Sequence, residues 1–155
     1  MRLNTLSGTV LALVLVAGTA AAQDKPNFSG EWKMNAARSD FGLLPAPASI
    51  TRTIAHKEPS LSIVETQEAG AGPQTMTRKY TTDGKNVTFE SGGAEVRGSA
   101  VWDGNTIVVD SKVEIAVLHF LDRMALSNDG KILTSTIRIT SPEGTVDLSV
   151  VFERQ

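Results

Sequence analysis

The first strand of this chain is contained in Phe28-Ser29-Gly30-Glu31-Trp32-Lys33-Met34-Asn35, which runs on to Ser39-Asp40-Phe41-Gly42. Gly30 and Trp32 form a Gly-x-Trp pattern on a segment in which polar and apolar residues alternate. An indole in this position can plug one end of a small antiparallel barrel, where it buries roughly 150–250 Å². The segment therefore predicts the closed base of a β-barrel.

The chain after Ser49 alternates apolar and polar residues, which is the pattern of half-buried β-strands. Beyond one turn at 36–38 there is no useful run with the period of a helix, and strands do not alternate with helices. The pattern predicts an all-β fold. Strands are expected at 28–34, 49–57, 61–68, 74–81, 87–89, 96–102, 107–115, 118–126, 133–139 and 146–152.

Tight turns separate several of these strands. The pairs Asp83-Gly84, Asp103-Gly104 and Asp129-Gly130 favour hairpins in which both central residues have positive φ. The flanking strands should then be adjacent and antiparallel, and a meander of about ten such strands removes its exposed edges by closing into a barrel. A two-sheet sandwich is the competing architecture, although its crossovers would need longer connections.

Residues 1–22 have the pattern of a secretory signal peptide. Arg2 supplies the positive charge, 10–17 is an apolar run, and Ala20-Ala21-Ala22 before Gln23 is a small-residue cleavage site. The apolar run is shorter than the ~20 residues needed to cross a bilayer. We expect residues 23–155 to form one domain that is periplasmic or extracellular, and an uncleaved membrane anchor is the alternative.

The amino-acid composition limits which kinds of site and which binding partners are possible. The chain contains no cysteine, so thiolate metal sites and cysteine nucleophiles are excluded and an exported fold must rely on packing. The formal net charge is −2, and charges of opposite sign are interspersed without forming a block. This distribution favours neither nucleic acid nor, once the signal is removed, an anionic membrane as a partner.

Three segments carry a resemblance to a known family. They are Phe28-x-Gly30-x-Trp32-Lys33-x-Asn35 followed by Ser39-x-Phe41, then Leu126-Ser127-Asn128-Asp129-Gly130-Lys131-Ile132-Leu133, and the terminal Val151-Phe152-Glu153-Arg154-Gln155. Together they resemble secreted bacterial lipocalin-like proteins of calycin type, with Met34 and Arg38 where that family has leucine and lysine. The resemblance implies a lipocalin-like barrel of about 8–10 strands. It implies no catalytic residue.

The resemblance also implies a role for the chain end. In calycins a basic side chain near the C-terminus lies over the indole of the first strand, and Arg154 is the matching position. A cation–π contact between Arg154 and Trp32 would contribute ~0.5–2 kcal/mol. The alternative is that Arg154 lies in solvent at a frayed terminus. Gly30, Trp32 and Arg154 are the predicted structural residues.

Charged side chains occur on strand faces that are otherwise apolar. If these faces point inward, a guanidinium could hold a ligand carboxylate below an apolar lining, as for a fatty-acid-like molecule. A bulge that turns the face outward, or arginines that reach solvent at the barrel rim, are the alternatives. The predicted ligand-binding residues are Arg52, His56, Met76, Arg78, Tyr80, Phe120 and Asp122.

Motifs of hydrolases, zinc proteases and phosphate-binding loops are absent from the sequence. His56 and His119 are far apart, so a zinc site would need an unmarked carboxylate, and His119 fits a histidine packed on a strand better than a haem ligand. We expect no metal, no cofactor and no catalysis. An enzyme would need an acid–base pair such as Asp122 with His56 or Tyr80.

The favoured function is an exported protein that binds a small apolar or amphipathic molecule. A structural or interaction protein with a filled barrel, acting through its surface, is the alternative. Segment 117–121 is apolar on both faces, which favours either a homodimer contact or an irregular buried segment. Segment 42–48, where prolines prevent a helix, could lie across an open barrel end.

Overall fold

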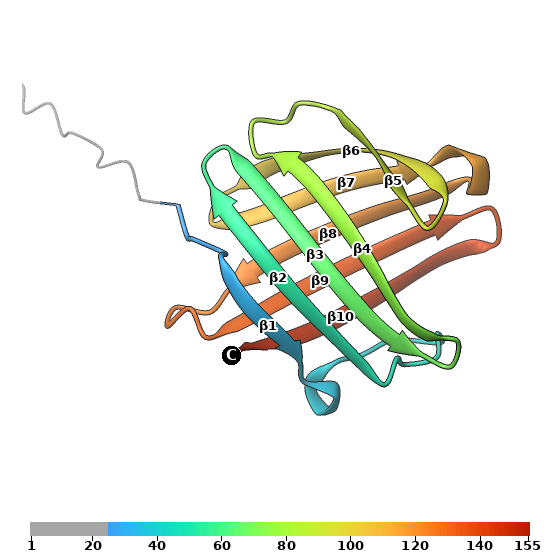
Figure 1. Cartoon of the computed structure of the whole chain (residues 1–155), viewed down its shortest axis with the longest axis horizontal. Coiled ribbons are helices and arrows are strands. Elements are labelled where there is room, and N and C mark those ends of the chain that lie inside the picture. The colour runs from blue at the N-terminus through green and yellow to red at the C-terminus, as the bar shows by residue number, and fades with distance from the viewer. Residues whose placement is uncertain (1–24) are drawn as a thin grey trace, which may run out of the picture.

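A computed structural model describes residues 25–155, and the predicted signal peptide at 1–22 lies outside the described residues. The described part of the chain folds into ten β-strands and two short 3₁₀ turns (Figure 1). The 3₁₀ turns are η1 (Ala36–Arg38) and η2 (Glu114–Ala116). The strands are β1 (Gly30–Met34), β2 (Ser49–Lys57), β3 (Ser60–Ala69), β4 (Gly72–Thr81), β5 (Val87–Ser91), β6 (Ala94–Asp103), β7 (Thr106–Val113), β8 (Leu118–Leu126), β9 (Ile132–Ser141) and β10 (Gly144–Arg154).

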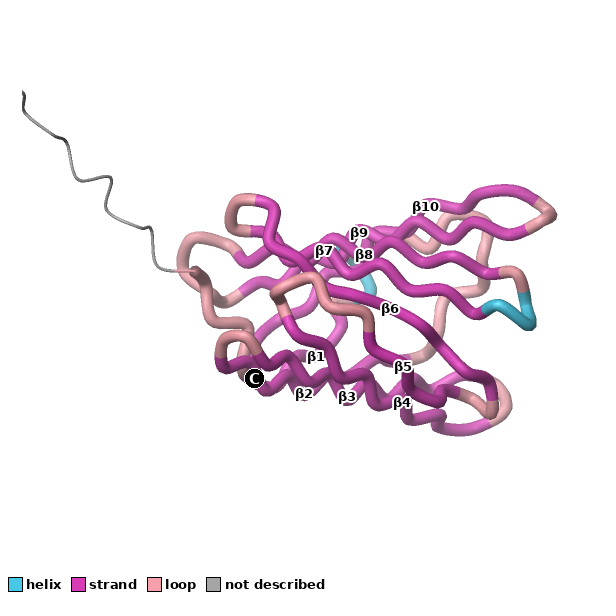
Figure 2. Tube along the Cα trace, turned by 90° about the horizontal axis from the view of Figure 1, so that it is seen from above, coloured by secondary structure: helices cyan, strands magenta, loops and turns pink. Residues whose placement is uncertain are grey.

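All ten strands belong to one antiparallel sheet, in the order β4-β3-β2-β1-β10-β9-β8-β7-β6-β5. Consecutive strands are neighbours in the sheet, with one exception: β4 and β5 do not pair and form its two edges. In addition, β1 pairs with β10. Figures 1 and 2 show β1–β4 lying across β7–β10 as the two layers of a flattened barrel. The predicted all-β meander, closed into a nearly complete barrel, is confirmed.

The Asp-Gly pairs do not have the turn geometry predicted for them. In each pair the glycine has positive φ and the aspartate does not, with +81° at Gly84, +59° at Gly104 and +67° at Gly130. Asp103 pairs with Thr106, so Gly104 is the first residue of a two-residue loop, the place that a type II′ turn reserves for glycine. Asp103 therefore precedes its turn, whereas Asp129 lies within the turn in which the N–H of Gly130 donates to the carbonyl oxygen of Ser127 at 2.8 Å.

The first of these pairs also fails to join its two strands. The N–H of Gly84 donates to the carbonyl oxygen of Ala100 at 2.9 Å, and Asp83 forms an isolated bridge with Val101 on β6. The segment after β4 thus turns to β6, and β5 pairs with β6 alone. The backbone ladder is consequently interrupted between β4 and β5.

Trp32 is buried at the end of the barrel where the two chain ends meet. Its indole N–H donates to the carbonyl oxygen of Phe28 at 3.1 Å. The Arg154 guanidinium lies 4.3 Å from the centroid of the indole, and it donates to the carbonyl oxygens of Ser29 at 2.6 Å and Gly130 at 2.8 Å. Arg154 thus lies over the indole and not in solvent at a frayed terminus.

Gly30 makes room for this arrangement. Its φ of +142° is one that residues with a side chain rarely adopt, and a β-carbon there would collide with Nη1 of Arg154. The glycine of the Gly-x-Trp pattern is therefore required twice, by backbone conformation and by the space that the arginine occupies.

The rest of the core fills the barrel around Trp32. Its largest fully buried apolar side chains are Phe28, Phe152, Leu61, Ile63, Ile107, Met124, Leu133 and Val150. Segment 42–48 follows η1 with Leu43 97% exposed, while the bridge between Asp40 and Ser149 ties the chain before it to β10. Neither of the two short turns among residues 25–155 is a helix long and apolar enough to cross a membrane.

We expect Gly30→Ala to lower the free energy of unfolding by about 1–3 kcal/mol, because alanine is strained at this φ and displaces Arg154. Urea unfolding measures the change. Gly70→Ala is the matched control, because a β-carbon at Gly70 meets nothing within 4 Å and its φ is not positive. Equal unfolding midpoints for the two variants would contradict the role given to Gly30.

Candidate functional site

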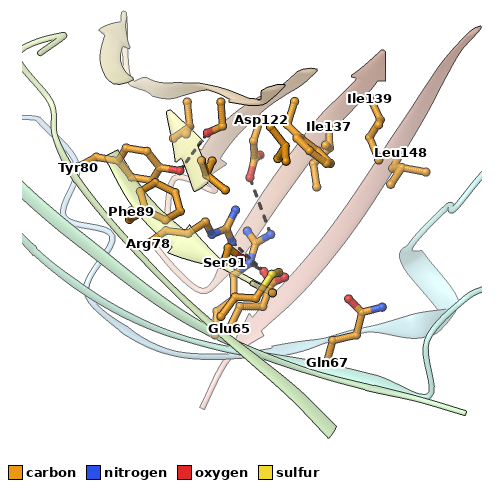
Figure 3. A pocket seen from close by; sticks show the side chains of 18 residues that line it. Glu65, Gln67, Arg78, Tyr80, Phe89, Ser91, Asp122, Ile137, Ile139 and Leu148 are labelled. Carbon is orange, nitrogen blue, oxygen red and sulfur yellow. Dashed lines mark hydrogen bonds and ion pairs between the residues drawn. The ribbon is translucent and has the colours of Figure 1, made fainter. Parts of the chain in front are cut away.

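A cavity of about 360 Å³ lies inside the barrel between its two layers (Figure 3). This volume falls in the lower part of the range of roughly 300–1,000 Å³ that small-molecule sites occupy. Its apolar walls are formed by Met76, Phe89, Val96, Val109, Val113, Phe120, Ile137, Ile139 and Leu148. Its remaining lining residues are Arg52, Glu65, Gln67, Arg78, Tyr80, Ser91, Gly92, Ser111 and Asp122.

Six of the seven predicted ligand-binding residues line this cavity. Period-two alternation places them on the inward face of three strands that are distant in sequence. Arg52 is 3% exposed, so the interpretation in which the arginines reach solvent at the rim fails for it. The six are Arg52 from β2, Met76, Arg78 and Tyr80 from β4, and Phe120 and Asp122 from β8.

Arg52 is the centre of a buried charge cluster. Its Nε donates to Glu65, and its Nη1 donates to the hydroxyl of Ser135 at 2.8 Å. Ser135 donates in turn to Asp122, whose other carboxylate oxygen lies 3.8 Å from Nη2 of Arg52. Burial alone would lower the pKa of Arg52, but Glu65 and Asp122 outweigh it and raise that pKa, so the guanidinium stays charged.

Glu65 is shared by two arginines. It accepts from Arg52 and, at 3.1 Å, from Nη2 of Arg78. Burial raises the pKa of the Glu65 carboxyl, but the charges of Arg52 and Arg78 outweigh burial and hold that pKa below its ordinary value. The glutamate is therefore ionised inside the barrel.

Sequence analysis misses Glu65, although a signal for it exists. Alternation puts Glu65 on the same face as Leu61 and Ile63. The hairpin between β2 and β3 then places it directly opposite Arg52. Reading the cross-strand register outward from the Glu58-Pro59 turn would have found the pair.

Arg78 is less completely paired than Arg52. Its side chain is 18% exposed, and within the described part of the chain its hydrogen bonding is limited to Nη2 and Glu65. Its Nε is the one buried side-chain nitrogen or oxygen among the described residues that lacks a hydrogen-bond partner. A buried donor without a partner costs about 1–3 kcal/mol. The Nη1 of Arg78 also has no hydrogen-bond partner among the described residues but is not a buried atom, so it is the donor that an acceptor in the cavity can reach.

Tyr80 adds a hydroxyl beside Arg78. Its oxygen lies 3.0 Å from the hydroxyl oxygen of Ser111, and its ring meets Phe89 edge-on with 5.5 Å between centroids. Burial raises the pKa of the Tyr80 phenol, so the group is a neutral donor and acceptor near physiological pH. Figure 3 shows Tyr80, Phe89 and Arg78 on one side of the cavity, and Ile139 and Leu148 on the other.

His56 differs from the expectation, because it does not line the cavity. Its Nδ1 accepts from the backbone N–H of Phe28 at 3.3 Å, and its Nε2 lies 2.8 Å from a carboxylate oxygen of Glu58. Its ring also packs near Trp102, with 5.8 Å between centroids. Both nitrogens are thus engaged at the closed end of the barrel, and His56 has no free group to offer a ligand in the cavity.

The other candidate positions lie away from the cavity. His119 is partly exposed, with Nε2 3.0 Å from a carboxylate oxygen of Asp110. Among residues 25–155 no group of three or more His, Asp or Glu side chains could hold a metal ion. Val117 is left-handed, with a φ of +50°, and 64% exposed, so segment 117–121 begins irregularly. A homodimer contact there stays a prediction. Segment 42–48 contributes nothing to the cavity lining.

Comparison with known proteins relates this chain to others by fold. No family model and no curated protein matches the sequence. Secretory abundant heat soluble protein 4 from Ramazzottius varieornatus superposes with a TM-score of 0.64 at 10% identity, over 86% of this chain and 99% of that one. Zebrafish ileal bile acid-binding protein, in complex with cholic acid, gives 0.58 at 16% identity over 83% and 98%.

A third structure extends the same likeness. Fatty-acid-binding protein 1 from Echinococcus granulosus superposes with a TM-score of 0.56 at 10% identity, over 82% of this chain and 96% of that one. These similarities show that the barrel has the same fold as these three proteins. At such low identity they show the fold alone.

We expect Glu65→Gln to lower the free energy of unfolding by about 3 kcal/mol, because Arg52 and Arg78 would lose the anion they share and the buried Arg52 would keep only the more distant Asp122. Urea unfolding near neutral pH tests this. The exposed Glu95→Gln on β6 is the matched control and should change stability by less than about 0.5 kcal/mol. An unchanged midpoint in Glu65→Gln would contradict the role of the cluster.

The lowered pKa of Glu65 also predicts how the stability of the fold depends on pH. The pKa of Glu65 in the folded protein lies below its ordinary value of 4.5, so its ionised form stabilises the fold above that pH. The contribution is lost as the pH falls below 4.5 and through the folded pKa. Unfolding measured from about pH 6 to about pH 3 should therefore show a steeper loss of stability in the native protein than in Glu65→Gln.

Proposed function

We propose that this protein binds a small apolar or amphipathic molecule inside its barrel. The observation that carries the proposal is the cavity of about 360 Å³, with apolar walls and a few convergent polar groups. A site of this make-up excludes water from a ligand tail and fixes a ligand head by hydrogen bonds. The ligand would lie between the two layers, with its head towards Arg78 and Tyr80 and its tail towards Ile139 and Leu148.

The similar structures support this proposal. Two of them are named for what they bind, fatty acids in one case and bile acids in the other. The similarity includes the whole barrel, and the cavity of this chain lies inside that barrel. We further infer that the chain is a member of the secreted bacterial lipocalin-like group that its sequence resembles.

The competing functions find less support. A barrel that acted only through its surface would have no need of an interior cavity of this size. An enzyme built on Asp122 would need His56 or Tyr80 as its partner. His56 is bonded to Glu58 and Tyr80 to Ser111, so neither is aimed at Asp122.

We also propose that the protein is exported and acts in the periplasm or outside the cell. The proposal rests on the positive charge at Arg2, the apolar run 10–17 and the Ala20-Ala21-Ala22 site. A fold without cysteine needs no oxidising enzyme in that compartment.

Gln67→Trp should weaken binding of the uncharged fluorescent probe N-phenyl-1-naphthylamine by at least about tenfold, because an indole at this lining position fills part of the cavity. Glu68→Trp is the matched control, since the next residue of β3 points to the opposite face and is exposed. Fluorescence titration gives both affinities. Absence of probe binding to the native protein, or equal loss in both variants, would contradict the proposed function.

Expression of the full chain in a bacterium should yield a periplasmic protein whose first residue is Gln23. Intact mass and N-terminal sequencing of the periplasmic fraction measure this. Leu13→Arg is the control, because a charge in the apolar run should keep the precursor in the cytoplasm. A native chain that retains Arg2 and sediments with membranes would instead favour the uncleaved anchor.

A further inference from the structure

We infer that the cavity selects ligands whose head group is uncharged and carries a hydrogen-bond-accepting oxygen, and that it discriminates against carboxylates. The inference rests on the proposed binding function and names the chemical class of its ligand. It replaces the expectation, drawn from sequence, that a guanidinium in the barrel holds a ligand carboxylate.

The charges that line the cavity balance one another. The titratable groups of the lining are Arg52 from β2, Glu65 from β3, Arg78 and Tyr80 from β4, and Asp122 from β8. The formal charges of the two guanidinium groups and the two carboxyl groups sum to zero. The phenol is neutral because burial raises its pKa. No uncompensated positive charge therefore remains in the cavity to attract an anion.

The contacts show that the charges that balance one another lie close together. Glu65 lies between Arg52 and Arg78 and bonds to both. Asp122 bonds to Ser135 and forms an ion pair with Arg52 at 3.8 Å. An anionic ligand would therefore have to compete with a buried carboxylate for its arginine, and would leave one negative charge unpaired in a site of low polarity.

An uncharged ligand with an acceptor oxygen can bind without disturbing these ion pairs. The Nη1 of Arg78 has no hydrogen-bond partner among the described residues and, unlike Nε, is not a buried atom, so it can donate to an oxygen without breaking the bond from Nη2 to Glu65. The hydroxyls of Tyr80 and Ser111 use one hydrogen in their mutual bond, which leaves the other for a ligand. Long-chain alcohols, esters, aldehydes and amides have the required oxygen and an apolar tail for Ile139 and Leu148.

Competition against N-phenyl-1-naphthylamine tests the inference, with decanol, methyl decanoate and decanoate as matched competitors. Near pH 8 decanol and methyl decanoate should displace the probe at concentrations at least about tenfold lower than decanoate. The affinity for decanoate should rise as the pH is lowered towards about 6, because binding takes up a proton, while that for decanol stays constant. Decanoate that competes as well as decanol at both pH values would overturn the inference.

A carboxylate is harder to desolvate than a hydroxyl in any apolar site, so the decisive readout is the ratio of the two affinities in charge variants. Glu65→Gln and Asp122→Asn each remove one negative charge from the cavity. Each should shift the ratio towards decanoate by at least about tenfold. A folded variant of either kind with the native ratio would overturn the inference.

Arg78→Met gives an independent test that leaves Arg52 with both of its carboxylate partners. It should weaken decanol binding by about fivefold to tenfold, because the unpartnered donor is lost. Arg138→Met is the matched control, since that arginine is exposed and pairs with Asp147 on the surface. Unchanged decanol affinity in Arg78→Met would overturn the inference. Failure of the native protein to bind the probe at all would instead contradict the proposed function itself.

Discussion

The pairing of β1 with two strands at once is the constraint on which this barrel depends. The strand is only five residues long, yet it joins β2 on one side to β10 on the other. Trp32 lies directly opposite Arg52 in one pairing and Arg154 in the other. The last residue of the chain contributes as well, because the backbone N–H of Gln155 donates to the carbonyl oxygen of Glu31 at 2.9 Å. The two ends of the described barrel therefore stabilise each other.

This closure also determines what the interior must contain. Because Arg52 is held opposite Trp32 on the inward face, its charge has no route to solvent and needs partners inside. Glu65 comes from the same layer, whereas Asp122 and Ser135 come from the facing one, so the cluster links both layers of the barrel. Apolar residues of similar volume would give equal or greater stability than a buried ion cluster. Stability therefore does not account for the cluster, and the ligand selection proposed above would give it a role.

Sequence reasoning succeeded where one local rule was enough and failed where two elements had to be placed together. Alternation with a period of two found the strands and the inward positions of Arg52, Arg78 and Asp122, because that period follows from the pleat itself. It could not separate His56 from Arg52, since both lie on one face of a strand that runs from the closed end into the cavity. The interruption between β4 and β5 depends on which strand the segment after Asp83 meets, and no local pattern encodes that. The Asp-Gly pairs were given one turn geometry although they have three, because Asp103 precedes its turn, Asp129 lies within one and Asp83 bridges to β6.

Because sequence patterns do not show which strands meet, they located the arginines of the cavity but not the carboxylate that pairs with both of them. Two arginines on apolar faces indicate a site for an anion as long as their partners are unknown. The register places Glu65 opposite Arg52 and diagonal to Arg78, so a carboxylate of the protein itself already pairs with both arginines. The cavity then has a polar side and an apolar side, since Arg78, with its unpartnered Nη1, and Tyr80 lie on one side of it and Ile139 and Leu148 on the other. Under the proposed function, such a cavity would select its ligand by the position of one acceptor oxygen relative to an apolar tail, and its internally paired charges would exclude anionic ligands.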